Sequence, residues 1–209
     1  APLSDRVLVR ASIEASARSA WLSDPTVKPR DRAGRALCEQ LVAAHNTRRL
    51  ESAERNERKV AQILDLANLL ELTVRESDGF RDPWVHEKRP SATAAMTELM
   101  DVEAVGGEDS IGKDVQSYLS LFVHFSPAGV MDAIARDTVD DVGDGIQAGR
   151  LSSDPARVNK LIALGVYAYL LAADRYVLLM GWDNTRLVDA TRAHIALLER
   201  LQGEGWITP

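Results

Sequence analysis

The chain has 209 residues, of which 45% are hydrophobic and 27% are charged, and this is the composition of a globular protein with a sizeable core. It excludes collagen-like, disordered and low-complexity proteins, and the single cysteine, Cys38, excludes an internal disulfide or a cysteine-built zinc site. We therefore expect a reducing, cytoplasmic setting and one domain over residues 1–209.

The net charge of −6 is unevenly distributed. Residues 1–60 carry 12 Lys/Arg against 8 Asp/Glu, whereas residues 61–209 carry 13 against 23. A basic segment of this kind can meet nucleic acid or an acidic protein surface. Aromatic residues are not interleaved with these arginines as base stacking requires. The charge therefore favours an acidic surface of the same chain or of a twin subunit.

Helical spacing dominates the first third of the chain. Apolar residues recur at three- and four-residue steps over 3–22, and Asp24-Pro25 ends this helix. A second helical region begins near Pro29 and continues to Leu72. As one helix it would span roughly 65 Å, which is too long for a compact domain of this size. We therefore expect a break near 45–52 that divides it in two.

The middle of the chain has the weakest pattern. Turn residues predict a loop that holds Trp84 and His86, followed by a short helix that ends at Met100. Gly106-Gly107 breaks the chain again, before a helix that Pro127 interrupts. No convincing strand or repeat is recognised in this region or elsewhere.

The C-terminal third has the strongest helix signal. It follows a loop predicted at 143–153 and begins at Asp154-Pro155, a cap with proline in the first turn. The uncharged stretch 161–173 is shorter than the about 20 apolar residues of a membrane span, so we expect a buried central helix that ends at Gly181. Its predicted core residues are Leu161, Ile162, Val166, Leu170 and Val177.

Asn184 is the predicted N-cap of a last helix that continues to about Gln202. Together these elements predict an all-α fold, a single-domain bundle of about six or seven helices.

His124 ends an apolar helical segment, with Ser120 and Ser117 four and seven residues before it. A histidine titrates near neutral pH, so His124 is a candidate for acid–base chemistry. No nucleophile and orienting acid complete a catalytic set around it. The alternative is a half-buried histidine whose ring nitrogens are satisfied by neighbouring groups.

Arg10, Glu14 and Arg18 are spaced by four residues and form a ladder on one face of the first helix. Such ladders usually face solvent, but the many alanines and serines of this helix favour close packing on several sides. A partly buried Glu14 needs a partner, which is either an arginine or His124. We predict that Glu14 and His124 lie close together inside the bundle.

Two further patterns resemble functional motifs, but neither motif is complete in this sequence. Four aspartates resemble a magnesium-binding pattern, but no second ligand set accompanies them and neighbouring glycines favour a solvated loop. Arg81 and His86 have the spacing of the ribonuclease motif of the HEPN family, although Pro83 lies between them and favours a surface loop. The aspartates are Asp137, Asp140, Asp141 and Asp144.

Two segments carry a resemblance to a known family. The first has Arg10, Glu14 and Trp21-Leu22 before an Asp-Pro turn and an arginine-rich helix, and the second has Tyr118, Ser120, His124 and Ser126. This arrangement is similar to that of uncharacterised bacterial all-helical proteins distantly like the HEPN superfamily, which includes toxin and phage-defence ribonucleases and non-catalytic helpers. The likeness covers about a third of the chain. It implies a HEPN-like helical bundle.

Three functions follow as expectations. The first is a HEPN-like interaction or defence-associated module without classical catalysis, which forms a homodimer and binds RNA or protein but no membrane. The second is a metal-independent ribonuclease with His86 or His124 as the acid–base group and Arg10 or Arg81 against the phosphate. The third is a small-molecule pocket between the apolar helix and the serine–histidine helix. We expect no metal or cofactor. The candidate catalytic residues are His124, Glu14, Arg10 and Ser120, and the candidate binding residues are Tyr118, Ser126 and Arg18.

Overall fold

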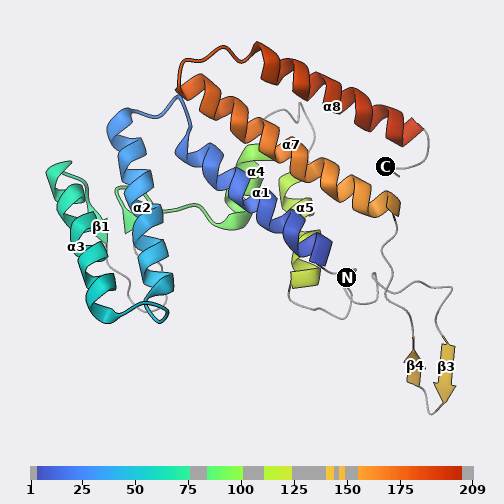
Figure 1. Cartoon of the computed structure of the whole chain (residues 1–209), viewed down its shortest axis with the longest axis horizontal. Coiled ribbons are helices and arrows are strands. Elements are labelled where there is room, and N and C mark those ends of the chain that lie inside the picture. Colours follow the sequence, from blue (N-terminus) through green and yellow to red (C-terminus); the bar gives the residue numbers. More distant parts are fainter. Residues whose placement is uncertain are drawn as a thin grey trace. The chain divides into compact units, whose positions relative to one another are not determined.

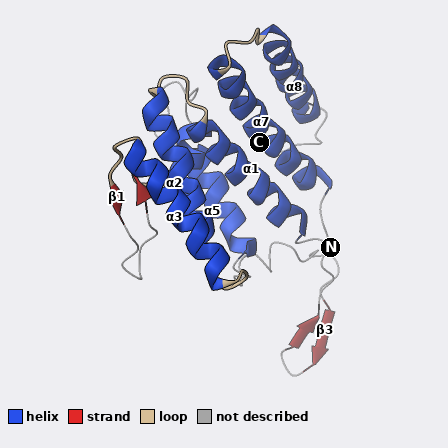
Figure 2. Cartoon of the chain, turned by 60° about the vertical axis from the view of Figure 1, so that its left-hand side comes forward, coloured by secondary structure: helices blue, strands red, loops and turns tan. Residues whose placement is uncertain are grey.

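A computed structural model describes residues 4–75, 84–100, 111–123, 140–143, 146–148 and 155–203. The chain divides into two compact units, one made of residues 1–21 with 92–209 and the other of residues 22–91. Helices dominate both units (Figure 1 and Figure 2), which confirms the predicted all-α class. One domain over residues 1–209 stays a prediction.

The first unit contains five described helices and one hairpin. The strands β3 (Asp140–Gly143) and β4 (Ile146–Ala148) pair antiparallel, with Asp140 opposite Ala148. We expected no strand and a loop beginning at 143, and both expectations were wrong for this hairpin. The two short strands satisfy their backbone N–H and C=O groups by pairing with each other, and the helical spacing used for the prediction does not reveal such pairing. The helices are α1 (Ser4–Leu22), α4 (Ala92–Met100), α5 (Ile111–Val123), α7 (Pro155–Leu179) and α8 (Thr185–Gly203).

One apolar cluster holds α1, α4, α5 and α7 together. In Figure 1, α4 and α5 lie behind α1 and α7, and α8 lies along α7. Burial of these side chains stabilises the unit by about 25 cal/mol for each Å² of apolar surface removed from water. The buried residues are Val9, Ile13, Ala17, Ala20, Ala95, Met96, Leu99, Met100, Leu119, Leu161, Ala168 and Ala172.

Helix α7 is not the enclosed central helix that its composition predicts. Leu161 and Leu170 are buried as expected and Val177 is partly buried, but Ile162 and Val166 are 50% and 39% exposed. A helix turns by about 100° per residue, so a helix packed from one side buries only part of its circumference. The prediction assumed that other elements surround α7 on all sides, so it wrongly assigned Ile162 and Val166 to the core.

The ends of the C-terminal helices follow local chemistry. Gly181 adopts a φ of +66° just after α7, a conformation that costs glycine little, and it confirms the predicted helix end. At the start of α8, the Asp183 carboxylate accepts hydrogen bonds from the backbone N–H and the hydroxyl of Thr185. The Asn184 side chain, predicted as the cap, instead donates to Asp174.

The second unit is built on an antiparallel pair of helices, α2 (Pro29–Thr47) and α3 (Ala53–Leu69). The predicted break falls between them, where the Ser52 hydroxyl accepts a hydrogen bond from the backbone N–H of Arg55. Strands β1 (Val74–Arg75) and β2 (Trp84–Val85) pair antiparallel, and β2 packs on α2. Trp84 therefore lies in a strand and not in the predicted loop.

Three ion pairs tie the segment after β2 to one face of α2. On α2 the charges alternate at four-residue steps, and the opposing segment carries the complementary signs. The pairs are Asp31 with His86, Arg35 with Glu87, and Glu39 with Arg89.

Candidate functional site

Helix α1 turns its charges away from its most exposed side. The Arg10 Nε lies 2.6 Å from Glu14 Oε1, and these side chains are only 14% and 31% exposed. Arg6, one turn earlier, is 1% exposed. An ordinary surface helix places its charges outward. The pair gives the partly buried Glu14 an arginine partner, which was one of the two predicted possibilities.

The exposed stripe of α1 is uncharged. Its members follow steps of four, three and four residues, so they share one face of the helix. Leu8, the largest, is 68% exposed. The stripe consists of Leu8, Ser12, Ala15 and Ser19.

A matching stripe follows α7. Its residues recur at steps of four and three, and Tyr169 is 62% exposed. The charged residues of α7 are placed elsewhere: Arg175 lies 3.6 Å from Glu98 of α4, and Asp174 accepts a hydrogen bond from Asn184. The stripe consists of Ile162, Val166, Tyr169, Ala173, Tyr176 and Met180. We call the two stripes together the α1–α7 face.

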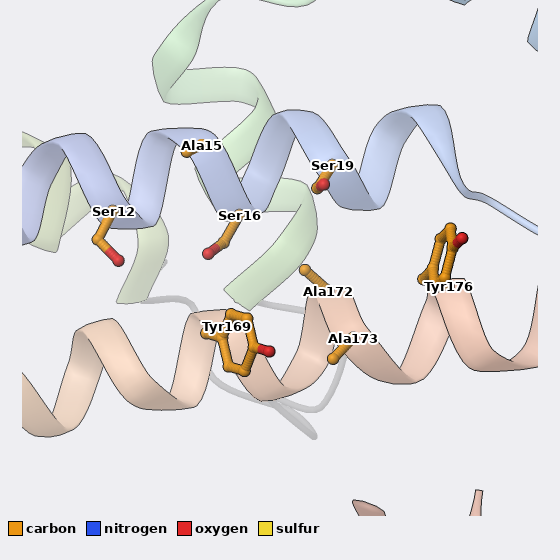
Figure 3. Close-up of a pocket in the computed structure, with 8 residues that line it drawn as sticks. All are labelled: Ser12, Ala15, Ser16, Ser19, Tyr169, Ala172, Ala173 and Tyr176. Atoms are coloured by element: carbon orange, nitrogen blue, oxygen red, sulfur yellow. The ribbon is translucent and has the colours of Figure 1, made fainter.

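A groove of about 380 Å³ lies between the two stripes. Figure 3 shows Tyr176 extending from α7 toward α1 and the Tyr169 ring lying over α7, with Ala172 and Ala173 between the two tyrosines. The opposite wall is formed by small residues of α1, and among them Ser16 is only 6% exposed, with its hydroxyl directed into the groove. The wall residues are Ser12, Ala15, Ser16 and Ser19.

The end of α7 is closed by aromatic and backbone contacts. The rings of Tyr176 and Trp182 meet edge to face with centroids 6.0 Å apart. On α8, His194 Nε2 lies 3.1 Å from the Ala163 carbonyl oxygen of α7. The His194 contact places α8 beside α7, on the side of α7 that faces away from α1 in Figure 1.

The structure brings few of the predicted site residues together. Ser120 donates to the Gln116 carbonyl oxygen and accepts from the Gln116 side chain, so its hydroxyl serves its own helix. Tyr118 packs against the core, and Arg18 is partly buried. His124 and Ser126 lie outside the described residues, and with them the predicted contact between Glu14 and His124.

His86 has a structural setting in the second unit. Its φ is +64°, and its ring Nε2 lies 3.0 Å from Asp31 Oδ1. Its backbone N–H donates a hydrogen bond to the Thr73 carbonyl oxygen. Gly34 of α2 accommodates this arrangement, since an added Cβ there would lie 2.8 Å from the His86 Cβ. Arg81, the other half of the ribonuclease motif, lies outside the described residues.

The aspartate cluster is split by the hairpin. Asp140 and Asp141 belong to β3, whereas Asp137 and Asp144 lie outside the described residues. Among the residues that the structure describes, no group of three or more His, Cys, Asp or Glu side chains could hold a metal ion. Cys38 is buried in the second unit, and burial raises the pKa of its thiol, which disfavours the reactive thiolate.

In the described part of the chain, one helix, Val158–Leu179, is long and apolar enough to cross a membrane by length and composition. A core helix of a water-soluble protein meets the same criterion. Only 28% of its most apolar 18-residue stretch is buried, and the remainder includes the exposed residues Ile162, Val166 and Tyr169.

The α1–α7 face was missed by the sequence analysis, although both halves left a signal. The small residues of the first helix indicated close packing, and the uncharged stretch of α7 indicated contact with an apolar environment. Comparison of the chain with protein-family models, curated proteins and solved structures finds no match.

Proposed function

We propose that the protein is a helical-bundle interaction module without classical catalysis, and that the α1–α7 face is its binding surface. The observation that carries the proposal is the exposure of Leu8, Ile162, Val166 and Tyr169 on a face without charge. Contiguous exposed apolar surface on a folded protein usually marks a site of interaction. Aromatic residues such as tyrosine are also enriched at protein interfaces.

A protein partner suits this face better than RNA. Nucleic-acid binding depends on lysine and arginine side chains that neutralise phosphates, and this face carries none. The ribonuclease alternative gains nothing from His86, whose imidazole is engaged by Asp31. The HEPN-like relationship, the defence association and the cytoplasmic setting remain part of the proposal, and they rest on the sequence segments described above.

A second candidate is a small uncharged ligand in the groove. Its volume of about 380 Å³ lies within the range of small-molecule sites, and the Ser16 hydroxyl is a buried polar group directed into it. Benzyl alcohol and benzoate are matched neutral and anionic probes for this site. Binding of benzyl alcohol that shifts NMR signals around Ser16, with no binding of benzoate, would support this candidate.

The interaction proposal is tested with Nile red, an uncharged dye that fluoresces on apolar surfaces. In protein diluted until it is monomeric, we expect the native chain to enhance the emission, Tyr169→Glu to reduce that enhancement by at least half, and the melting temperature to stay within about 2 °C. Ala196→Glu, which adds the same charge at an exposed position of α8 outside the α1–α7 face, is the control and should leave both quantities unchanged. A Tyr169→Glu variant that melts many degrees lower would show that this residue belongs to the core, and the proposal would fail.

A further inference from the structure

We propose that the occupant of the α1–α7 face is a second copy of this chain, docked across a two-fold axis. The inference rests on the proposed function, because it requires the face to be a binding surface. An apolar surface can bind several kinds of partner, and a second copy of the chain is the one proposed.

The extent of the face argues against a small ligand as its sole occupant. A ligand that fills the groove would cover Tyr169 and Tyr176 but would leave Leu8, Ile162 and Val166 in water. The side chains of the whole face expose on the order of 700 Å², close to the about 800 Å² that each partner contributes to a typical stable interface. A protein-sized partner therefore fits the area.

Charge favours a partner with the same surface. The chain has a net charge of −6, so two copies repel except where they meet through uncharged regions. The α1–α7 face is such a region: Arg10 and Glu14 are paired on another side of α1, and Arg175 lies near Glu98. A two-fold contact through this face buries no charge on either subunit, which avoids the desolvation penalty of buried ions.

The shape of the face also suits self-association. In a two-fold interface the same patch serves both partners, so it needs both projecting and receiving elements. Tyr169 and Leu8 project from the face, and the small residues Ser12 and Ala15 leave a depression beside them. The tyrosines of one subunit can therefore pack against the small-residue wall of the other, with the Ser16 hydroxyl available to a partner's polar group.

Sedimentation equilibrium of the full chain tests the proposal. We expect a dimer whose dissociation constant rises about 30-fold or more in Tyr169→Glu, because each interface would then bury two carboxylates. Ala196→Glu should sediment like the original chain. Bismaleimidohexane should cross-link Ala15→Cys, whose cysteine lies on the face, and not Ala94→Cys, whose cysteine is exposed on α4.

If the chain remains monomeric at 100 times the concentration used in the Nile red experiment, a second copy is not the partner. Equal cross-linking of the two cysteine variants would overturn this face as the contact. Flotation of the monomer with phosphatidylcholine vesicles, lost in Tyr169→Glu, would assign the face to a membrane. If the chain is monomeric, with or without binding to vesicles, the Nile red experiment still tests the proposed function separately.

Discussion

At the scale of single residues, the second unit depends on a close approach between Gly34 and His86. His86 is held at φ +64° by its hydrogen bond to Thr73 and its pairing with Asp31, so its side chain has little room to withdraw from α2. The sequence showed the glycine but gave no sign of this role, because the approach joins residues 52 positions apart. Only the folded chain brings them together.

Gly34→Ala should therefore destabilise the second unit by about 1–3 kcal/mol, although alanine favours helix over glycine by about 1 kcal/mol. Its Cβ would lie 2.8 Å from the His86 Cβ, which is closer than carbon atoms pack. Gly165→Ala on α7 is the matched control, since its Cβ would meet Val9 at an ordinary 3.8 Å. Thermal unfolding decides: a rise in melting temperature for Gly34→Ala would show that the contact imposes no constraint.

Glu51 gives a prediction of pH dependence. A hydrogen bond from Lys59 lowers the pKa of this partly exposed carboxylate below its ordinary value of 4.5. A lowered folded-state pKa contributes stability above the unfolded value, and that stability is lost as the pH falls through the folded value. Glu51→Gln should therefore lower the melting temperature at pH 6 and lose this effect at more acidic pH. Glu57→Gln, an exposed change on α3, is the control, and an equal response of both variants at every pH would refute the assignment.

At the scale of elements, helix positions could be predicted from the sequence because caps and breakers are local. Pro29, the break before Ser52, Pro155 and Gly181 each act through neighbouring residues, and the structure confirms them. The burial of α7 could not be predicted in this way. Composition shows that the helix is apolar, but the number of sides on which it is covered depends on the packing of distant elements.

Two substitutions on α7 separate its two sides. Leu170→Asp places a carboxylate in the core, where Leu170 is 8% exposed, and should prevent folding or cost more than about 3 kcal/mol. Ile162→Asp, on the exposed stripe, should change monomer stability by less than about 0.5 kcal/mol. Urea unfolding at low protein concentration measures both. Equal destabilisation by the two variants would restore the enclosed-helix interpretation.

At the scale of the whole molecule, the chain is two compact helical units, and the first carries an uncharged face on α1 and α7. The sequence predicted the helical class, which the structure confirms, and the predicted homodimer with an RNA or protein partner stays a prediction. It placed the candidate site at His124 and Glu14, because single polar residues in apolar surroundings attract functional interpretation. The uncharged face becomes visible only when α1 and α7, two helices that are far apart in the chain, are placed side by side.

The rate of tyrosine nitration by tetranitromethane, read peptide by peptide in a mass spectrometer, tests the α1–α7 face most directly. The chain has four tyrosines, and two of them, Tyr118 and Tyr167, pack partly buried against the core. We predict fast nitration of Tyr169 and Tyr176 in dilute protein and a clear slowing of both as the concentration rises and the face becomes covered. Tyr118 and Tyr167 should react slowly at every concentration. Slow nitration of Tyr169 in dilute protein, or a rate that does not depend on concentration, would contradict the account.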